Sequence, residues 1–521
     1  MNRQQVKKWV GAAAVVSLIA TTACSSGKEN QSASSSPSAS PTQAAASASA
    51  SPQPTTSAPA EIKMYVSDFG KETPAKDNPF VKYMEGKTNT KLNLTFLPHG
   101  TGSQYLDNLK LKFAAGDFPD VYMNFSGPEA DLIKNDKVLP LNDLIDKYGP
   151  NLKKYIPKQA WDAVSQNGKI LAIPQPNTTS GNVLFIRKDW LDKLNLQVPK
   201  TSDELLNVLR AFRDGDPNGN GKKDEIPFSM REKISWGENI FGMWGVSTQW
   251  HEMYLNNEVI FANLTPNMLK GVEYLRTMYT EKLLDTEFLT NTKAIWEQKV
   301  KSGLVGVFDH VPDQAWQWQL DITAGATGQK PDIIAIPTPR GTGYDGPLGT
   351  KWNPVSKTYI IFKSAKNPEA IVKYFDWLLS DEGQIFASLG IEGTTYKKEG
   401  DKLVFDTTKL KDVTFLTDMF AMNGYNDKIV QAKNPDPVAY GKIKTALDIV
   451  SKEGFVNEAV GMPPIANDFN MHTMFQEEAA KIITGADPVD KFNDFVATWR
   501  KQNGDKLIKE RTDWYNQYRK K

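Results

Sequence analysis

Residues 104–122 read QYLDNLKLKFAAGDFPDVY and combine a predicted helix with a predicted strand. The apolar side chains of residues 104–115 recur about every 3.6 positions, which predicts an amphipathic helix. The run GDFPDVY at 116–122 then turns into a short apolar segment of the kind that forms a buried strand. A helix that leads into a buried strand is typical of a parallel α/β sheet.

The flanking residues continue this alternation. EIKMYVS at 61–67 and LNLTFL at 92–97 have strand-like patterns, and a helix is predicted between them at 78–88. On the C-terminal side, GKILAIP at 168–174 and VLFIR at 183–187 predict two more strands. Strands and helices therefore alternate along the chain, which predicts the α/β class.

The composition excludes several function classes. The chain of 521 residues is long enough for roughly two or three domains. Its 62 Lys and Arg nearly balance 61 Asp and Glu, so no strong field attracts nucleic acid, and we expect no such partner. Its one cysteine excludes an intramolecular disulfide, and its four scattered histidines lack the spacing of a zinc site.

The N-terminus predicts export and lipid anchoring. Residues 1–23 form a signal peptide, because a basic start precedes an apolar run at 10–20 that is too short to span a bilayer. The small residues before Cys24 resemble a lipobox, although Thr21 stands where leucine is usual. We expect Cys24 to be diacylated and to anchor the chain on the extracellular face of the cell membrane. The alternative is plain secretion with Cys24 unmodified.

The segment after the cysteine predicts a flexible tether. Residues 24–60 are dominated by Ser, Ala and Pro, so they lack the apolar surface that would offset their ordering entropy. A long tether suits a domain that must clear a thick cell wall. A Gram-positive host is therefore expected.

A metal-binding loop is predicted at 216–225. The capping box TSDE at 201–204 opens a helix, and the loop DPNGNGKKDE follows it. Oxygen-bearing side chains occupy loop positions 1, 3, 5 and 9, and Gly221 allows the sharp turn at position 6. The position-12 glutamate of an EF-hand is replaced by Pro227, so Glu225 would take its place. The predicted Ca²⁺ ligands are Asp216, Asn218, Asn220, the Lys222 carbonyl, Asp224 and Glu225; the alternative is a surface turn without metal.

Five segments together resemble one protein family. They are the motifs at 116–122 and 168–174 already quoted, and the longer stretches 184–229, 366–393 and 490–518. In order and spacing they are similar to the extracellular solute-binding proteins of ABC importers, and above all to the carbohydrate-binding branch. Members of that branch that bind alginate oligosaccharides carry a calcium loop of this form. The resemblance therefore implies a structural Ca²⁺.

This resemblance also implies a fold and partners. The fold is the two-lobe, type II periplasmic-binding-protein-like architecture, with a hinge and an interlobe cleft that closes on ligand. The implied lobes are 61–174 plus 345–389 and 175–344 plus 390–521, with crossings near Pro174, Tyr344 and Leu389. The implied partners are a carbohydrate and the transmembrane subunits of an ABC permease. We expect a monomer and no enzymatic activity.

Aromatic and polar residues near predicted strand ends are candidate ligand contacts. Sugar rings stack on aromatic side chains, and polar groups bind their hydroxyls. The candidates are Asn124, Phe125, Gln175, Trp236, Trp244, Asp309, Trp316 and Trp352. Core packing is the alternative for each tryptophan and is expected for about half of them. Trp190, Trp377 and Trp499 lie in amphipathic helical contexts and are interpreted as core.

Two other functions remain open from the sequence. A lipid-anchored glycoside hydrolase would need two carboxylates about 5 to 10 Å apart. Asp309 and Asp313 are candidates, but no hydrolase motif surrounds them. A surface adhesin or the binding subunit of a sensor could use the same fold. Turnover of an oligosaccharide without any added partner would identify the enzyme.

The anchor gives a first prediction. Because Cys24 is the only cysteine and follows a small residue, Cys24→Ala should either leave the precursor unprocessed or release the protein from membranes. Membrane fractionation of both forms measures this. An alanine variant that still sediments with membranes at the wild-type level, beside a wild type that takes up no fatty acid, would contradict the anchor.

Overall fold

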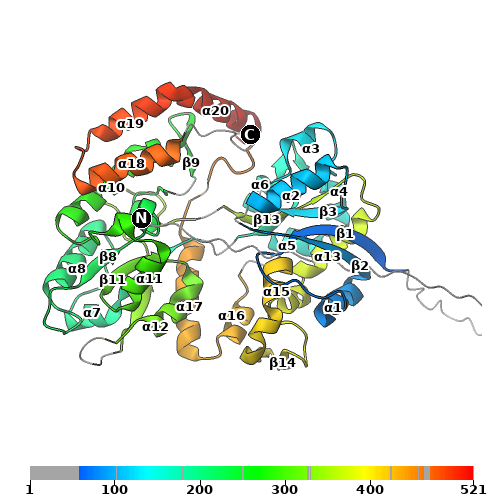
Figure 1. The fold of residues 1–521 in the computed structure, drawn as a ribbon, viewed down its shortest axis with the longest axis horizontal. Coiled ribbons are helices and arrows are strands. Elements are labelled where there is room, and N and C mark those ends of the chain that lie inside the picture. Colours follow the sequence, from blue (N-terminus) through cyan, green and yellow to red (C-terminus); the bar gives the residue numbers. More distant parts are fainter. Residues whose placement is uncertain are drawn as a thin grey trace, which may run out of the picture. The chain divides into compact units, whose positions relative to one another are not determined.

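The computed structural model describes residues 58–100, 103–125, 127–177, 181–248, 251–324, 328, 330–351, 353–422, 425–455, 457–462 and 470–519. The predicted signal peptide, Cys24 and nearly all of the tether lie outside these residues. The part from Ala58 to Lys521 forms one unit. Its described elements belong to two lobes, each with a sheet and a core of its own (Figure 1). Among the described helices, none has the length and apolarity needed to cross a membrane.

The first lobe is built on a five-stranded sheet of order β2-β1-β3-β13-β6. Its strands are β1 (Ala60–Ser67), β2 (Thr90–Leu97), β3 (Val121–Asn124), β6 (Ile173–Pro176) and β13 (Val355–Ile361), with small hairpins β4 (Ser165–Gln166)–β5 (Lys169–Ile170) and β14 (Tyr396–Glu399)–β15 (Lys402–Phe405). Its helices are α1 (Pro79–Thr88), α2 (Ser103–Ala114), α3 (Ala130–Lys134), α4 (Asn142–Tyr148), α5 (Pro150–Tyr155), α6 (Lys158–Ala163), α13 (Pro368–Leu379), α14 (Asp381–Leu389), α15 (Leu410–Phe420) and α16 (Asp427–Lys433).

Local sequence explains these elements. β1 pairs in parallel with β2 along its whole length, from Ala60↔Thr90 to Ser67↔Leu97, and α1 connects the two strands. Asn78 caps α1 by accepting from the backbone N–H of Phe80 at 2.9 Å. The predicted strand–helix alternation at 61–122 is confirmed. It gives the expected parallel β1, β2 and β3, because a βαβ crossover joins parallel strands.

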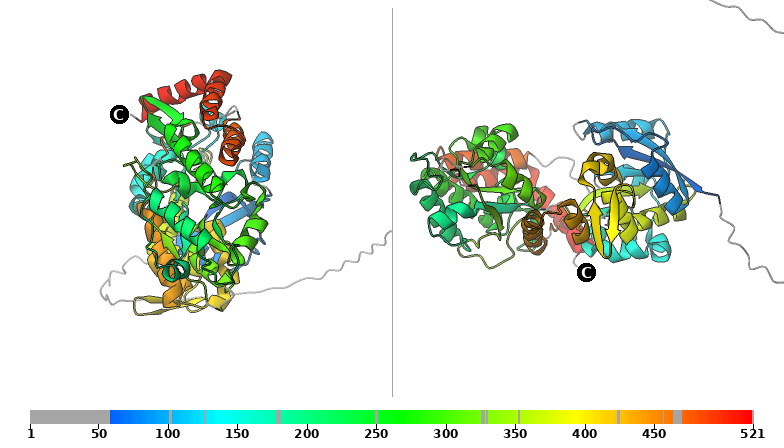
Figure 2. Two further views of the ribbon diagram at one scale, coloured as in Figure 1. Left: turned by 90° about the vertical axis from the view of Figure 1, so that its left-hand side faces the viewer. Right: turned by 90° about the horizontal axis from the view of Figure 1, so that it is seen from below.

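The second lobe is built on a four-stranded sheet of order β12-β7-β11-β8. Its strands are β7 (Val183–Arg187), β8 (Ile226–Ser229), β11 (Val305–His310) and β12 (Ile333–Ile336), with the separate hairpin β9 (Glu252–Leu255)–β10 (Glu258–Phe261). Its helices are α7 (Lys188–Lys193), α8 (Ser202–Asp214), α9 (Glu238–Gly242), α10 (Pro266–Thr280), α11 (Lys293–Lys301), α12 (Ala315–Asp321), α17 (Pro437–Lys452), α18 (Met471–Thr484), α19 (Lys491–Trp499) and α20 (Asp505–Tyr518). Figure 2 shows the C-terminal helices, in red, beside the green elements of this lobe.

Several sequence-based expectations for this lobe are confirmed. Thr201 caps α8, because its hydroxyl accepts from the Glu204 backbone N–H at 3.2 Å. Trp190 and Trp499 are fully buried, as the amphipathic pattern predicted. Trp190 meets Phe212 edge-on with ring centroids 5.2 Å apart. These contacts fix α7 and α8 on the sheet.

One lobe boundary differs from the sequence-based expectation. The resemblance assigned residues after Leu389 to the second lobe. Instead, Phe405, Leu416 and Ala432 belong to the core of the first lobe. The physical reason is that α15 packs against the first sheet, where the Tyr359 hydroxyl on β13 donates to the Met419 carbonyl at 3.3 Å. The chain therefore returns to the second lobe between α16 and α17.

A buried polar network joins the segments that cross between the lobes. Asn239, on α9, donates to the Asn182 carbonyl at 3.0 Å and accepts from the Thr350 hydroxyl at 2.9 Å. The Glu453 carboxylate, just after α17, accepts from the Thr338 hydroxyl at 2.7 Å. Asn239 also donates to Thr338, at 3.2 Å. Hydrogen bonds in a buried network hold their partners in one geometry, so these crossing segments are tied together on the second lobe.

The C-terminal helix provides another contact between the lobes. Arg519, which follows α20, donates to the Asp162 carbonyl on α6 at 2.8 Å and lies 3.3 Å from the Asp162 carboxylate. It also donates to the Val460 carbonyl. These contacts place residues 457–462 against the first lobe.

Candidate functional site

The carboxyl ends of strands gather at one edge of each sheet. In the first lobe β3 is parallel to β1 and antiparallel to β13, which is itself antiparallel to β6. In the second lobe β8 is parallel to β11, and β7 is antiparallel to β11. The chain leaves the first sheet at the carboxyl end of β6 and enters the second sheet at the amino end of β7. Because β7 is antiparallel to its neighbours, this crossing joins the edges at which most other strands of both sheets have their carboxyl ends. Open α/β sheets bind ligands at such edges.

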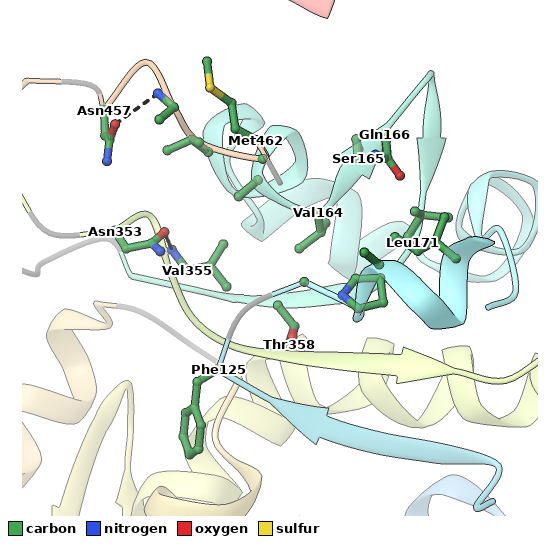
Figure 3. Close-up of a pocket in the computed structure, with 18 of the residues that line it drawn as sticks. Phe125, Val164, Ser165, Gln166, Leu171, Asn353, Val355, Thr358, Asn457 and Met462 are labelled. Carbon is green, nitrogen blue, oxygen red and sulfur yellow. Dashed lines mark hydrogen bonds between the residues drawn. The ribbon is translucent and has the colours of Figure 1, made fainter. Parts of the chain in front are cut away.

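A cavity of about 610 Å³ lies at this edge of the first lobe. Phe125 follows β3, Val355 and Thr358 belong to β13, and Val164 and Leu171 flank the β4–β5 hairpin (Figure 3). Val164, Leu171 and Val355 form a mainly apolar wall, whereas the Phe125 ring points away from them and packs with Phe69, His99 and Tyr105. A cavity of this size and character is typical of small-molecule sites.

Polar side chains from both lobes interrupt the apolar wall. Ser165 and Gln166 come from β4, and Asn353 precedes β13 (Figure 3). Asn457 approaches from the opposite side, where its Oδ1 accepts from the Ala459 backbone N–H at 3.0 Å. Amides and hydroxyls both donate and accept hydrogen bonds. The cavity can therefore bind a ligand with mixed apolar and hydroxyl surfaces.

A buried ion pair forms part of the cavity lining. Glu252, at the start of β9, is 1% exposed, and Arg511 of α20 is 8% exposed. The two side chains make a two-pronged contact: an Arg511 terminal nitrogen donates to Glu252 Oε2 at 2.7 Å, and Arg511 Nε contacts Oε1. Paired in this way, each charge offsets the desolvation cost of the other.

An aromatic cluster lies at the corresponding edge of the second lobe. Trp236 meets Trp296 edge-on at a centroid distance of 4.6 Å and His310, the last residue of β11, at 4.5 Å. The Arg231 guanidinium lies 4.7 Å from the Trp236 ring centroid. Trp316, on α12, is half-buried against the same core. The cluster therefore gathers flat rings just beyond the carboxyl end of a central strand.

The loop that presents Trp236 is strained. Lys233, Ile234 and Trp236 have φ angles of 60°, 57° and 56°, in the left-handed region. A β-branched or aromatic residue is costly there, about 1–3 kcal/mol each. Surrounding contacts offset this cost, including a 2.9 Å hydrogen bond from the Arg231 N–H to the Ser235 carbonyl. Strain of this kind concentrates at binding sites.

Burial shifts two ionisable groups at this edge. It lowers the pKa of His310 to about 4, assisted by the nearby Lys293 charge. It raises the pKa of Asp309 well above its usual value, and the Glu238 carboxylate adds to the effect. His310 is therefore neutral at physiological pH.

The structure brings few of the sequence-predicted ligand residues into the cavity. Phe125 lines it. Asn124 instead donates to the Glu129 carboxylate at 3.1 Å, and Gln175 donates to the Ala421 carbonyl at 2.6 Å. The side chains of Asn124 and Gln175 therefore bind neighbouring parts of the first lobe. Although both lie at strand ends, neither lines the cavity.

The tryptophan candidates divide as follows. Trp244 is 4% exposed and packs in the second core, where its Nε1–H donates to the Thr342 carbonyl at 3.3 Å. Asp309 is fully buried and accepts from the Asn239 N–H at 2.9 Å. These two predictions do not fit the structure, because neither side chain is accessible to a ligand. Trp236 and Trp316 remain half-buried at the strand edge, and Trp352 lies outside the described residues.

Sequence analysis missed most of the cavity lining. Gln166, Glu252 and Asn457 lie outside the segments that carry the family resemblance, and Arg511 lies inside one, at 490–518, but was not a candidate ligand contact. An apolar pattern interrupted by a charge, as at Arg511 on the inner face of α20, is the one signal that could have marked such a residue. Their convergence depends on tertiary contacts between segments more than 200 residues apart.

The predicted metal loop has oxygens directed inward. Asp216 accepts from the backbone N–H groups of Asn220 and Gly221 at 3.1 Å each. Asp224 accepts from the Asn218 amide at 3.0 Å. Both carboxylate oxygens of Glu225 are buried and have no hydrogen-bond partner among the described residues. Burial raises the Glu225 pKa, and the Asp216 and Asp224 charges add to the rise.

These donors suit a hard cation, which prefers carboxylate and amide oxygens. The buried oxygens of Glu225 would gain a partner from such an ion. The described residues contain no group of three or more His, Cys, Asp or Glu side chains that could hold a metal ion. The amide oxygens of Asn218 and Asn220 and the Lys222 carbonyl would therefore have to contribute.

Known proteins with similar sequences identify the family of this chain. The profile of the family described as bacterial extracellular solute-binding protein matches residues 69–385. The fructooligosaccharide ABC transporter substrate-binding protein FusA of Streptococcus pneumoniae is 30% identical over 49% of this chain, a match that spans 55% of FusA. Lipoprotein LipO of Bacillus subtilis is 23% identical over 87% of this chain and 92% of its own length. The polygalacturonan/rhamnogalacturonan-binding protein YtcQ of Bacillus subtilis is 24% identical over 86% and 89%.

Solved structures share the fold. An extracellular solute-binding protein of Bifidobacterium longum subsp. infantis superposes with a TM-score of 0.67 at 20% identity, over 88% of this chain and 99% of that one. An EF-hand mutant of Streptococcus pneumoniae FusA with fructo-nystose gives 0.60 at 20%, over 88% and 99%. Alginate-binding protein AlgQ2 without calcium ion gives 0.60 at 20%, over 88% and 98%. The two-lobe periplasmic-binding-protein-like fold expected from sequence is thereby confirmed.

The lowered pKa of His310 gives a second prediction. The unfolded chain binds a proton to this histidine near pH 6.5, but the folded protein does so only near pH 4. Stability should therefore fall as pH drops from 6.5 towards 4, because the unfolded state then binds more protons. Between neutral pH and about pH 5, wild type should lose about 2 kcal/mol more unfolding free energy than His310→Gln.

Denaturant unfolding at both pH values measures this difference. His472→Gln, on α18, controls for the loss of a histidine elsewhere in the same lobe. An equal pH dependence in wild type and His310→Gln would contradict the burial of a neutral imidazole at this edge.

Proposed function

Because the chain belongs to the family of bacterial extracellular solute-binding proteins, we propose that it captures a carbohydrate between its lobes and delivers it to an ABC importer. One observation carries the proposal. The cavity is lined by residues of both lobes, with Phe125 and Val355 on one side and Glu252 and Arg511 on the other. A ligand in this cavity touches both lobes at once, and so favours the conformation in which they are together.

The chemistry of the lining suits a sugar. Each sugar ring has apolar C–H faces and a rim of hydroxyls. Val164, Leu171 and Val355 offer apolar surface, whereas Gln166 and Asn457 offer amides that donate and accept. Trp316 and the Trp236 loop add flat rings at the strand edge of the second lobe, outside the cavity lining. An oligosaccharide could use both regions.

The number of carboxylates in the cavity lining favours a binding protein over a glycoside hydrolase. A glycoside hydrolase needs an acid and a second carboxylate beside the scissile bond. Glu252 supplies the one carboxylate among the described lining residues, and Arg511 is paired with it. Asp309 is buried behind the strand edge. We therefore propose a binding protein, with the permease as the partner that moves the sugar.

Anchoring at the cell surface completes this proposal. A signal peptide at 1–23, a lipidated Cys24 and the tether at 24–60 would hold the lobes at the extracellular face of the membrane, within reach of the permease. The similarity to a protein named lipoprotein, LipO, supports this arrangement.

A structural Ca²⁺ in the 216–225 loop is part of the proposal. The partnerless oxygens of Glu225 support it, as does the likeness to FusA, whose structure is described as an EF-hand mutant. The loop lies between α8 and β8, so an ion there would fix how the helix leads into the strand. Binding to the native state alone would stabilise that state by mass action.

Trp316 gives a prediction that tests carbohydrate capture. A panel of oligosaccharides screened by thermal shift should contain ligands, and calorimetry with the best of them should show weaker binding by Trp316→Ala. Truncating an aromatic anchor typically costs about 2 kcal/mol, or roughly thirtyfold in Kd. Trp377→Ala is the matched control, because Trp377 is half-buried on α13 of the first lobe. Equal affinity in Trp316→Ala and Trp377→Ala would remove Trp316 from the site.

The calcium loop gives a further prediction. Chelation by EGTA should lower the melting temperature of wild type, and added Ca²⁺ should restore it. Glu225→Gln should melt at the same temperature with and without EGTA, because it lacks one charged ligand. Elemental analysis of purified protein measures the bound metal. A wild type that contains no calcium and melts identically in EGTA would contradict the site.

A further inference from the structure

We propose that the ligand of the interlobe cavity is an uncharged polyhydroxyl saccharide and not an oligomer of uronic acids. This inference rests on the proposed carbohydrate function and names the substrate class. It is not set by kinship, because the relatives include FusA, named for a fructooligosaccharide, and YtcQ, named for polygalacturonan. The charges that face the cavity distinguish the two classes of saccharide.

The buried charges of the cavity neutralise each other. Glu252 and Arg511 are both buried, and two nitrogen–oxygen contacts join them. The positive charge of Arg511 is therefore already matched by a carboxylate. Lys134, at the end of α3, is the other cation among the described lining residues, and it is exposed to water.

Three other basic side chains around the cavity either have a hydrogen-bond or ion-pair partner or are neutral. At the second-lobe edge, Arg231 pairs with the Glu232 carboxylate at 2.9 Å. His310 is neutral at physiological pH because burial lowers its pKa to about 4. On the other face of the first sheet, the Lys357 ammonium donates to the Asp418 carbonyl, and the Asp418 carboxylate pairs with Lys71.

The sequence also shows whether further basic residues occur at the positions between 101 and 469 that the structure does not describe. Of the positions between 101 and 469 that lie outside the described residues, none is a lysine, arginine or histidine. Additional cations from these segments are therefore excluded by composition alone.

A uronic acid oligomer carries one carboxylate per sugar ring. Moving a carboxylate from water into a mainly apolar cavity carries a large desolvation cost unless a cation pairs with it. The charge of Arg511 is already matched by Glu252, so a ligand carboxylate beside this pair would leave a net negative charge buried in the cavity. Neutral hydroxyls carry no such penalty, and they both donate and accept, as the Ser165 hydroxyl and the Gln166 and Asn457 amides do. The cavity thus matches a neutral saccharide.

Two panels of equal chain length test the inference on the full-length protein. One contains neutral fructo-, xylo-, manno- and galacto-oligosaccharides, and the other contains oligomers of galacturonate, mannuronate and guluronate. Calorimetry should give the best neutral ligand a Kd at least about tenfold lower than any uronate. That Kd should change little between low and high salt, because no ion pair forms on binding.

Substitution of the ion pair provides an independent arm. Glu252→Gln leaves the Arg511 charge unmatched in the cavity and should improve uronate binding about tenfold or more, with a new salt dependence. The double variant Glu252→Gln/Arg511→Gln restores neutrality and should return to neutral selectivity. Glu258→Gln is the matched control, because it breaks the 3.1 Å pair with Arg500 outside the cavity lining.

Different results would contradict the neutral class of ligand and the capture of carbohydrate itself. Wild-type binding of a uronate more tightly than every neutral oligosaccharide would overturn the neutral class and leave carbohydrate capture intact. If neither panel shifts the melting temperature or gives heat of binding, carbohydrate capture itself is contradicted. The wild-type panels decide both points even if Glu252→Gln fails to fold.

Discussion

The hydrogen-bond network around Asn239 is the constraint on which the two-lobe arrangement depends. Each lobe has its own core, and hydrophobic burial alone would leave the segments between them unspecified. Asn239 holds Asn182 and Thr350, and Thr338 links the same group to Glu453. Asn182, Asn239, Thr338 and Thr350 are buried, so leaving one of them unpaired would cost about 1–3 kcal/mol. The network therefore fixes where the crossings at Asn182 and at Thr338–Thr350 leave the second lobe.

The cavity follows from this arrangement. Because the crossings lie at the carboxyl ends of the strands, the edges of both sheets are brought to the same region, and residues 457–462 and α20 approach the first lobe beside it. Glu252 and Arg511 enter the lining as a mutually neutralised pair. Local strain is concentrated at the other edge, where the loop before α9 holds Trp236 in a left-handed conformation. Rigid walls and a presented aromatic ring together suit capture of a ligand with flat apolar faces.

Much of the fold could be predicted because its signals are local. The parallel β1–α1–β2 unit, the capping box at Thr201 and the buried Trp190 all follow from patterns within about a dozen residues. The predicted lobe boundary at Leu389 was wrong because the packing partner of the helices that follow it is not encoded locally. An amphipathic helix such as α15 shows that it packs on something, but its pattern does not say on which lobe.

By itself, the sequence determined the α/β class, the family resemblance, and the predicted export segment and calcium-loop oxygens, because each depends on residue types at short, fixed spacing. Only the tertiary structure decided which side chains face the cavity. Trp244 and Trp316 were both candidate ligand contacts from sequence, yet one is enclosed by the second core and the other lies half-buried beyond β11. Glu252 and Arg511 are 259 positions apart and meet only because α20 packs beside the β9–β10 hairpin. Burial and pairing depend on neighbours distant in the chain, and no local pattern encodes them.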